Sequence, residues 1–174
     1  MTPEAPQPVK LLAAVLWADA SALGQALGRL EGLWGPIDVR GPPRAFDATR
    51  YYEPEMGPGL ARTIIAFARL DSPEVLVARK LESAAIEAEL RGPSGRRVNI
   101  DVGYLDVHKV VLGSLKHGPQ KIWLGRGVWA DIVCRYSRGA FHPFEWTFPD
   151  FRDGRYDEEL LRIREAYKSA LRMY

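Results

Sequence analysis

The sequence holds a single cysteine, Cys134, and three histidines among its 174 residues. One thiol cannot close an intramolecular disulfide, and this one lies in an alternating apolar segment, where we expect a small buried hydrophobe. His108, His117 and His142 show none of the paired spacings that zinc sites use. The sequence therefore predicts no structural zinc, no haem and a reducing, cytoplasmic environment.

Excess charge and long apolar runs are absent as well. Lys and Arg number 24 against 22 Asp and Glu, so the net charge of +2 gives little attraction to DNA or to an anionic membrane. The longest apolar run, Leu11 to Ala18, is too short to span a bilayer. The proline-rich start has no basic stretch before an apolar run, so it is not a secretory signal. We expect a soluble protein with no membrane or DNA partner.

Two common catalytic and phosphate-binding patterns are missing. No segment matches Gly-x-x-x-x-Gly-Lys-Ser/Thr, and Gly125-Arg126-Gly127 lies between two strand patterns, where a tight turn explains it better. Ser114 and Ser137 lack the Gly-x-Ser-x-Gly context of a nucleophilic serine. The sequence predicts no P-loop nucleotide site and disfavours covalent hydrolysis.

What is present fits one α+β domain covering residues 1–174, with a flexible start over residues 1–8. Folding at this length buries about 70% of the unfolded chain's surface, which is enough for a large core. Apolar patterns and turn signals predict, in order, a strand at 9–18, a helix from Ser21 to Trp34, a strand at 37–40, an irregular loop at 46–60, a strand at 62–70, a helix after Ser72-Pro73 and a strand from Arg97. We expect one face of the second helix to carry Val77, Leu81, Ala84, Ala85 and Ala88. This βαββαβ order is typical of a ferredoxin-like fold.

The second half adds an antiparallel meander. Strand patterns cover 121–124, 128–136 and 140–147, with turns at the glycines between them, and an amphipathic helix begins near Asp157. The sequence predicts a mainly antiparallel sheet with a ferredoxin-like start, a C-terminal β-meander and a final helix.

Polar residues with useful chemistry gather in the stretch from Arg97 to Lys116. In Val98-Asn99-Ile100-Asp101-Val102, the alternation places Asn99 and Asp101 on one face, about 7 Å apart. If lysines approach that face, an acid that accepts a proton or a metal would lie beside ammonium groups that suit a phosphate or carboxylate. An ordinary solvated sheet face explains the same alternation. The predicted ligand-binding residues are Tyr51, Tyr52, Glu53, Glu55, Asn99, Asp101, Tyr104, Lys109, Ser114 and Lys116.

Other features leave further functions open. Magnesium needs only one or two carboxylates, and the available acids are Glu53, Glu55, Asp101, Asp131 and Asp150, although turn caps and arginine pairs explain them better. The basic cluster of Arg91, Arg96 and Arg97 could contact RNA, and solvated surface is the alternative. The aromatic segment Phe141–Phe151 could contact a protein partner, and core anchoring is the alternative.

Five segments together resemble the bacterial domain-of-unknown-function family 4416. They are Pro8-Val9-Lys10-Leu11, Tyr51-Tyr52-Glu53-Pro54-Glu55-Met56-Gly57, Asn99-Ile100-Asp101-Val102-Gly103-Tyr104-Leu105, Leu124-Gly125-Arg126-Gly127-Val128 and Trp146-Thr147-Phe148-Pro149-Asp150. The resemblance covers nearly the whole chain. Some members are labelled GTP-binding proteins, so it hints at a nucleotide. This chain departs from the family pattern at Val102, where proline is usual, and at Gln120-Lys121, where a His-Arg pair is usual.

Two functions from different classes follow. The first is binding of a small anionic ligand, such as a nucleotide, through Asp101, Lys109, Lys116 and the Tyr51–Gly57 loop, with metal-assisted phosphoryl transfer or hydrolysis as its extension. The second is a non-catalytic interaction module for protein or RNA. The sequence does not decide whether the protein is an enzyme.

Overall fold

A computed structural model of the chain describes residues 1–2 and 4–174 and is built on one nine-stranded sheet. The strands are β1 (Val9–Trp17), β2 (Ile37–Arg40), β3 (Arg44–Ala45), β4 (Ala61–Asp71), β5 (Val98–Leu105), β6 (Lys109–Ser114), β7 (Ile122–Gly125), β8 (Val128–Ser137) and β9 (Ala140–Pro143). The helices are α1 (Ala20–Trp34), α2 (Glu53–Met56), α3 (Leu76–Glu89), α4 (Pro149–Arg152) and α5 (Asp157–Leu171), and a 3-10 turn, Pro73–Val75, leads into α3.

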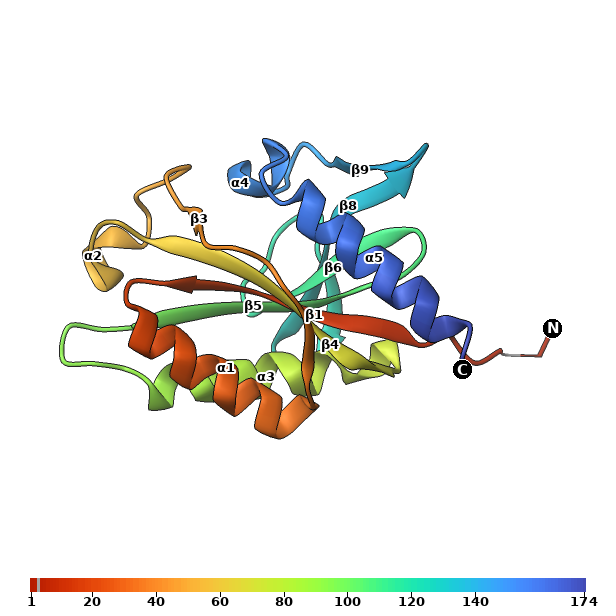
Figure 1. The fold of residues 1–174 in the computed structure, drawn as a ribbon, viewed down its shortest axis with the longest axis horizontal. Helices are drawn as coiled ribbons and strands as arrows, with labels where there is room; N and C mark the ends of the chain where they lie inside the picture. Colours follow the sequence, from red (N-terminus) through yellow and green to blue (C-terminus); the bar gives the residue numbers. More distant parts are fainter. Residues whose placement is uncertain (3) are drawn as a thin grey trace.

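The first half of the sheet has the ferredoxin-like arrangement that the sequence predicts. The strand order β2-β4-β1-β5 interleaves two βαβ units, with every neighbouring pair antiparallel. The connecting helices α1 and α3 cover the same face of the sheet (Figure 1). The second half continues the sheet as β6-β8-β7, with β9 paired to β8, so the predicted meander is confirmed.

The two sheet faces have separate cores. Alternate residues of β1, such as Leu11, Ala13 and Val15, pack under α1 and α3, while Leu12 and Ala14 face α5. α5 crosses the opposite face from α1 and α3 (Figure 1) and contacts β2, β4 and β9, so it joins the two halves of the sheet. In the described part of the chain, no helix is both long and apolar enough to cross a membrane.

The stretch from Arg97 to Lys116 folds as two strands that separate at one end. β5 and β6 pair only over 103–105 with 110–112, while β5 stays paired to β1 and β6 to β8 beyond that point. At the gap, two side chains of α3 replace the missing strand. The Ile100 N–H donates to Glu87 Oε1 at 2.6 Å, and the Ile100 carbonyl accepts from Lys80 Nζ at 3.0 Å. The backbone of β5 is thereby satisfied where β6 departs from it.

Some local predictions need correction. The helix predicted from Ser21 begins at Ala20, and Asp19 caps it, since its carboxylate accepts from the Ala22 N–H at 2.7 Å. The loop at 46–60 contains the short helix α2, which tolerates Pro54 in its first turn. The predicted flexible start includes residue 3, which lies outside the described residues, and the Pro8 carbonyl accepts from the Tyr167 hydroxyl at 2.8 Å.

Candidate functional site

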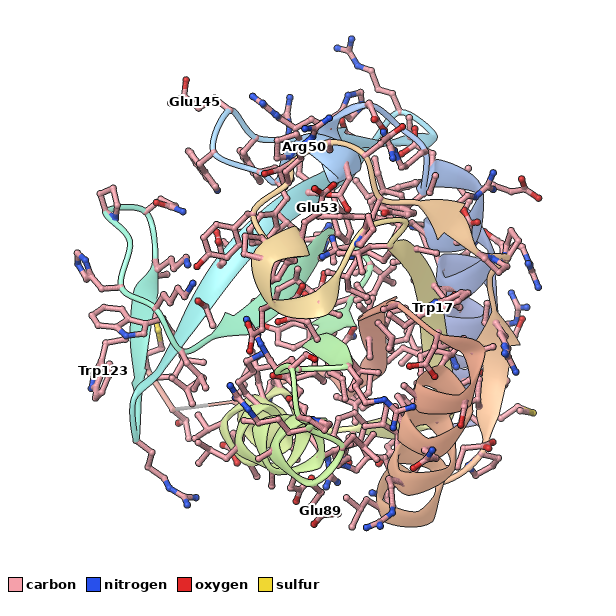
Figure 2. The ribbon with its side chains drawn as sticks, turned by 90° about the vertical axis from the view of Figure 1, so that its left-hand side faces the viewer. Trp17, Arg50, Glu53, Glu89, Trp123 and Glu145 are labelled. Carbon is pink, nitrogen blue, oxygen red and sulfur yellow. The ribbon has the colours of Figure 1, made fainter. Side chains whose placement is uncertain are left out.

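A cavity of about 440 Å³ opens where β5 and β6 separate. α3 forms one wall, the segment between β3 and α2 forms another, and residues at the start of α4 close the far side. Figure 2 views this end of the molecule, with α2 and Glu53 in front of the strands and α3 below them. The polar lining residues are Thr49, Tyr51, Tyr52, Arg62, Lys80, Glu87, Arg96, Asn99, Asp101, Ser114, Lys116, Lys121, Asp131 and Asp150, and Phe46, Leu112 and Phe148 are among the apolar ones.

A buried arginine organises the floor. Arg62, which is 2% exposed, donates to Asp150 Oδ2 at 2.5 Å and to Asp101 Oδ2 at 3.2 Å. Asp150 also accepts from the Tyr156 hydroxyl at 2.8 Å, and Asp101 accepts from the Asn99 amide at 3.2 Å. Each carboxylate therefore has a cation and a neutral donor, as buried charges require.

Arg96 fixes the side of the cavity next to α2. Its guanidinium donates to Glu55 Oε2 at 2.8 Å and to Asn99 Oδ1 at 2.7 Å, and lies 5.6 Å from the centre of the Tyr52 ring. Glu87 Oε2 lies 3.8 Å from the same guanidinium. Arg96 thus connects α2, α3 and β5, and its charge is balanced by carboxylates.

Two lysines at the mouth are held more loosely. The Lys116 ammonium donates to the Tyr51 hydroxyl at 2.7 Å and lies over that ring, 4.9 Å from its centre. The Lys121 ammonium donates to Ser114 Oγ at 2.9 Å, and its nearest carboxylate oxygen, on Asp131, is 3.9 Å away. That separation is too long for a hydrogen bond.

The surroundings shift several pKa values. Burial raises the pKa of Tyr52 to about 12, so this phenol stays protonated at neutral pH. Burial also raises the pKa of Glu87 and of Asp131 above the ordinary carboxylate value. The hydrogen bond from Lys116 and its charge lower the pKa of Tyr51. Glu87 on α3 and Asp131 on β8 are thus the acids of the cavity whose charged form burial disfavours.

The cavity brings together six of the ten predicted residues, namely Tyr51, Tyr52, Asn99, Asp101, Ser114 and Lys116. Asn99 and Asp101 share a face and touch through a hydrogen bond, as the alternation predicts. Glu53 and Glu55 lie on α2 and do not line the cavity, although Glu55 holds Arg96.

Tyr104 and Lys109 do not belong to this cavity. Tyr104 stands three positions from Asp101 on β5, so the period of two turns it to the opposite face. Lys109 begins β6 at the far end of the hairpin, where its ammonium pairs with Asp106. Both residues line a separate depression of about 260 Å³ beside the Tyr167 end of α5. The expectation that Lys109 approaches Asp101 is wrong.

Sequence reasoning did not place Arg62, Lys80, Glu87 or Lys121 in the site. Arg62 follows a strand alternation that puts it on the Asn99 and Asp101 side of the sheet, because Leu16 pairs with both Arg62 and Asn99. Lys80 and Glu87 are seven positions apart on α3, so they lie on the same helix face. That helical spacing was a usable signal, although it does not reveal the break between β5 and β6.

Within the described residues, no group of three or more His, Cys, Asp or Glu side chains could hold a metal ion. The basic cluster is largely paired, because Arg97 Nη2 donates to both oxygens of Asp19, at 3.0 and 3.1 Å, and Arg91 lies 3.6 Å from Glu55. The surroundings of these arginines are therefore acidic, unlike a phosphate-binding surface.

The aromatic segment is partly core. Phe141 and Phe151 are buried, while Trp146 and Phe148 are about 40% exposed, and Phe144 stacks on Trp146 with ring centres 4.8 Å apart. A second exposed apolar group lies on β7, where Trp123 extends from the sheet edge (Figure 2).

Comparison with known proteins places the chain in a family. A family model described as domain of unknown function DUF4416 matches residues 7–167. The chain belongs to the DUF4416 family. The match spans every strand and reaches to Tyr167 in α5, so it includes all the residues that line the cavity. No curated protein and no solved structure matches the chain.

Proposed function

We propose that the cavity between β5 and β6 binds a small anionic ligand, whose phosphate or carboxylate is held by Lys116 and Lys121. The observation that carries this proposal is the pairing state of the two ammonium groups. Among the described residues, no carboxylate oxygen lies within 4 Å of Lys116, and Lys121 has one only at 3.9 Å. Both lysines can therefore bind an anion without first giving up a close ion pair.

The other cations of the cavity serve its structure. Arg62 and Arg96 are already bound to carboxylates, and Lys80 is buried against the Ile100 carbonyl. A ligand anion at any of these three would compete with an existing partner. This difference confines the proposed anion position to the mouth, beside the hydroxyls of Tyr51 and Ser114.

Size and aromatic walls suit a small ligand, such as a nucleotide or another phosphate-containing molecule. The volume of about 440 Å³ lies in the range of small-molecule sites, which are mostly apolar with a few convergent polar groups. Phe46, Tyr52 and Phe148 supply ring surface on which a base could stack. We propose metal-assisted phosphoryl chemistry only as an extension, which requires a divalent cation brought with the ligand.

Thermal unfolding with inorganic phosphate, nucleoside phosphates and sugar phosphates, each with and without Mg²⁺, tests the proposal. We expect a saturable rise in Tm with at least one compound, because a ligand that binds only the native state stabilises it. In the Lys116→Ala/Lys121→Ala variant, affinity for that compound should fall by about 10- to 100-fold per lost contact, since a hydrogen bond to a charged group contributes about 1.5–3 kcal/mol.

Lys168→Ala provides the control, because Lys168 is an exposed lysine of α5 that pairs with Glu165. This variant should bind as the wild type does. Equal binding by the double lysine variant, or no saturable shift with any compound, would refute the proposed anion site.

One observation favours a second candidate function, a protein interaction surface at β7. Ile122, Trp123 and Leu124 are 59%, 54% and 40% exposed, on a strand that ends the sheet. Exposed apolar edge strands pair readily with other chains. We also propose a cytoplasmic location in a bacterium, which is supported by the buried lone cysteine and by the family resemblance.

A further inference from the structure

One acid in the cavity differs from the others in its partners. Glu87 accepts a backbone N–H, Asp101 is bound by Arg62 and Asn99, and Asp150 is bound by Arg62 and Tyr156. Asp131 has weaker partners, namely the side chain of Gln120 and the charge of Lys121. Its Oδ1 is buried without any partner in the described structure, and its Oδ2 lies 3.9 Å from the Lys121 ammonium.

Asp131 is also almost completely buried. Its side chain is 6% exposed, it lines the cavity, and it stands on β8 directly opposite Leu112 of β6. A buried carboxylate oxygen without a donor costs about 1–3 kcal/mol or more, so such a group is retained where something else satisfies it. The terminal torsion of an aspartate is broad, so a small rotation exchanges the two oxygens at the cavity surface.

Asp131 and the two lysines are neighbours. Lys121 lies beside Asp131, and its ammonium also donates to Ser114 Oγ and to the backbone carbonyl of Lys116. A ligand whose anion binds the two lysines therefore places its adjoining atoms next to the Asp131 carboxylate. The site offers complementary charges to a molecule that carries both signs within a few bonds.

We propose that the ligand is a small zwitterion, with an ammonium group two or three bonds from its phosphate or carboxylate, and that Asp131 is the residue that recognises this ammonium. This inference rests on the proposed anion site and adds the class of ligand. A charged donor suits Asp131 better than a hydroxyl, because a buried carboxylate is stabilised most by an opposite charge. Burial raises the pKa of Asp131, and the charge of Lys121 and the side chain of Gln120 offset this shift only in part.

Three probes that share one anion test the inference: ethyl phosphate, 2-hydroxyethyl phosphate and 2-aminoethyl phosphate, measured by calorimetry at neutral pH in EDTA. We expect the wild type to bind the aminoethyl compound at least tenfold more tightly than ethyl phosphate. In Asp131→Asn this preference should disappear, while ethyl phosphate binds equally well or more tightly, because a negative charge near Lys121 has been removed. A purely structural role for Asp131 would instead weaken both ligands together.

Asp71→Asn is the matched control, since it removes one negative charge outside the cavity, where Asp71 pairs with Arg79. It should keep the wild-type preference. Saturable binding of ethyl phosphate without an aminoethyl preference would overturn the inference and leave the anion site intact. Equal binding of the hydroxyethyl and aminoethyl compounds would also overturn it, and absence of binding by all three probes would remove the anion site as well.

Discussion

Arg62 connects two parts of the chain that are far apart in sequence, since it binds Asp101 of β5 and Asp150 of α4. The Arg62 side chain is 2% exposed and Asp150 is 1% exposed, so the pair is shielded from solvent. The guanidinium also lies 4.8 Å from the centre of the Phe46 ring. A cation held in this way keeps the floor of the cavity in one arrangement.

Replacing Arg62 should therefore destabilise the protein strongly. We expect Arg62→Met to lower the free energy of unfolding by about 3–5 kcal/mol, because it leaves a buried carboxylate without its cation. Urea unfolding followed by circular dichroism measures the loss. Arg69→Met is the comparison, since Arg69 is 63% exposed and its pair with Asp71 should contribute less than about 1 kcal/mol. Similar losses in the two variants would contradict the role of the buried pair.

Sequence alone predicts some residues of the cavity for a clear reason. Strand alternation is a short-range rule, so it correctly places Asn99 beside Asp101. The same rule excludes Tyr104 from that face. Lys80 was missed because a lysine at a helix position suggests solvent, whereas here it is 7% exposed and replaces a strand partner. Lys80 takes this role because β5 and β6 separate, and that separation depends on tertiary structure.

At the scale of elements, Gly103 sits where β5 and β6 begin to separate. A Cβ built on Gly103 would overlap the Val111 carbonyl oxygen and would lie 2.7 Å from Leu112 Cδ2. The strands approach here because no side chain intervenes, and they diverge immediately afterwards. The glycine is therefore required for the hairpin that shapes the cavity.

Gly103→Ala and Gly24→Ala should have opposite effects. We expect Gly103→Ala to destabilise the fold by about 1–3 kcal/mol or more, as overpacking against backbone does. Gly24 is exposed on α1 with no atom within 4 Å of the added Cβ, so Gly24→Ala should stabilise by about 0.5–1 kcal/mol. The urea midpoints of the two variants, compared with that of the wild type, measure both changes. A neutral Gly103→Ala would show that the strands can move apart at this point.

Long elements were predictable and short ones were not. β1, α1, β4 and α5 carry enough periodic residues for their patterns to be clear, and the final helix begins at Asp157 as expected. α2 and α4 have four residues each, which is about one turn and too few for a period. The expected apolar face of α3 was also wrong, because the buried residues are Leu76, Lys80, Ser83 and Ile86.

For the whole molecule, the order of elements indicates the ferredoxin-like half because its connections are local. The position of the meander relative to that half depends on α5, which the sequence predicts only as a helix that packs on the sheet. One core cluster contains residues of both halves, such as Leu12, Ile64 and Val133, together with Ile163 and Tyr167 of α5. The sheet contact between the halves is confined to three residue pairs of β5 and β6.

We expect the two halves to unfold together, because α5 and its shared core compensate for the short contact between β5 and β6. Native-state hydrogen exchange in increasing urea should bring the slowest amides of β1 and β8 to one free energy of opening. Ile163→Ala should lower that value by about 2–5 kcal/mol in both strands, since it leaves a cavity in the shared core. A lower and separate plateau for β8, or a loss confined to one strand, would instead show that the meander opens independently of the ferredoxin-like half.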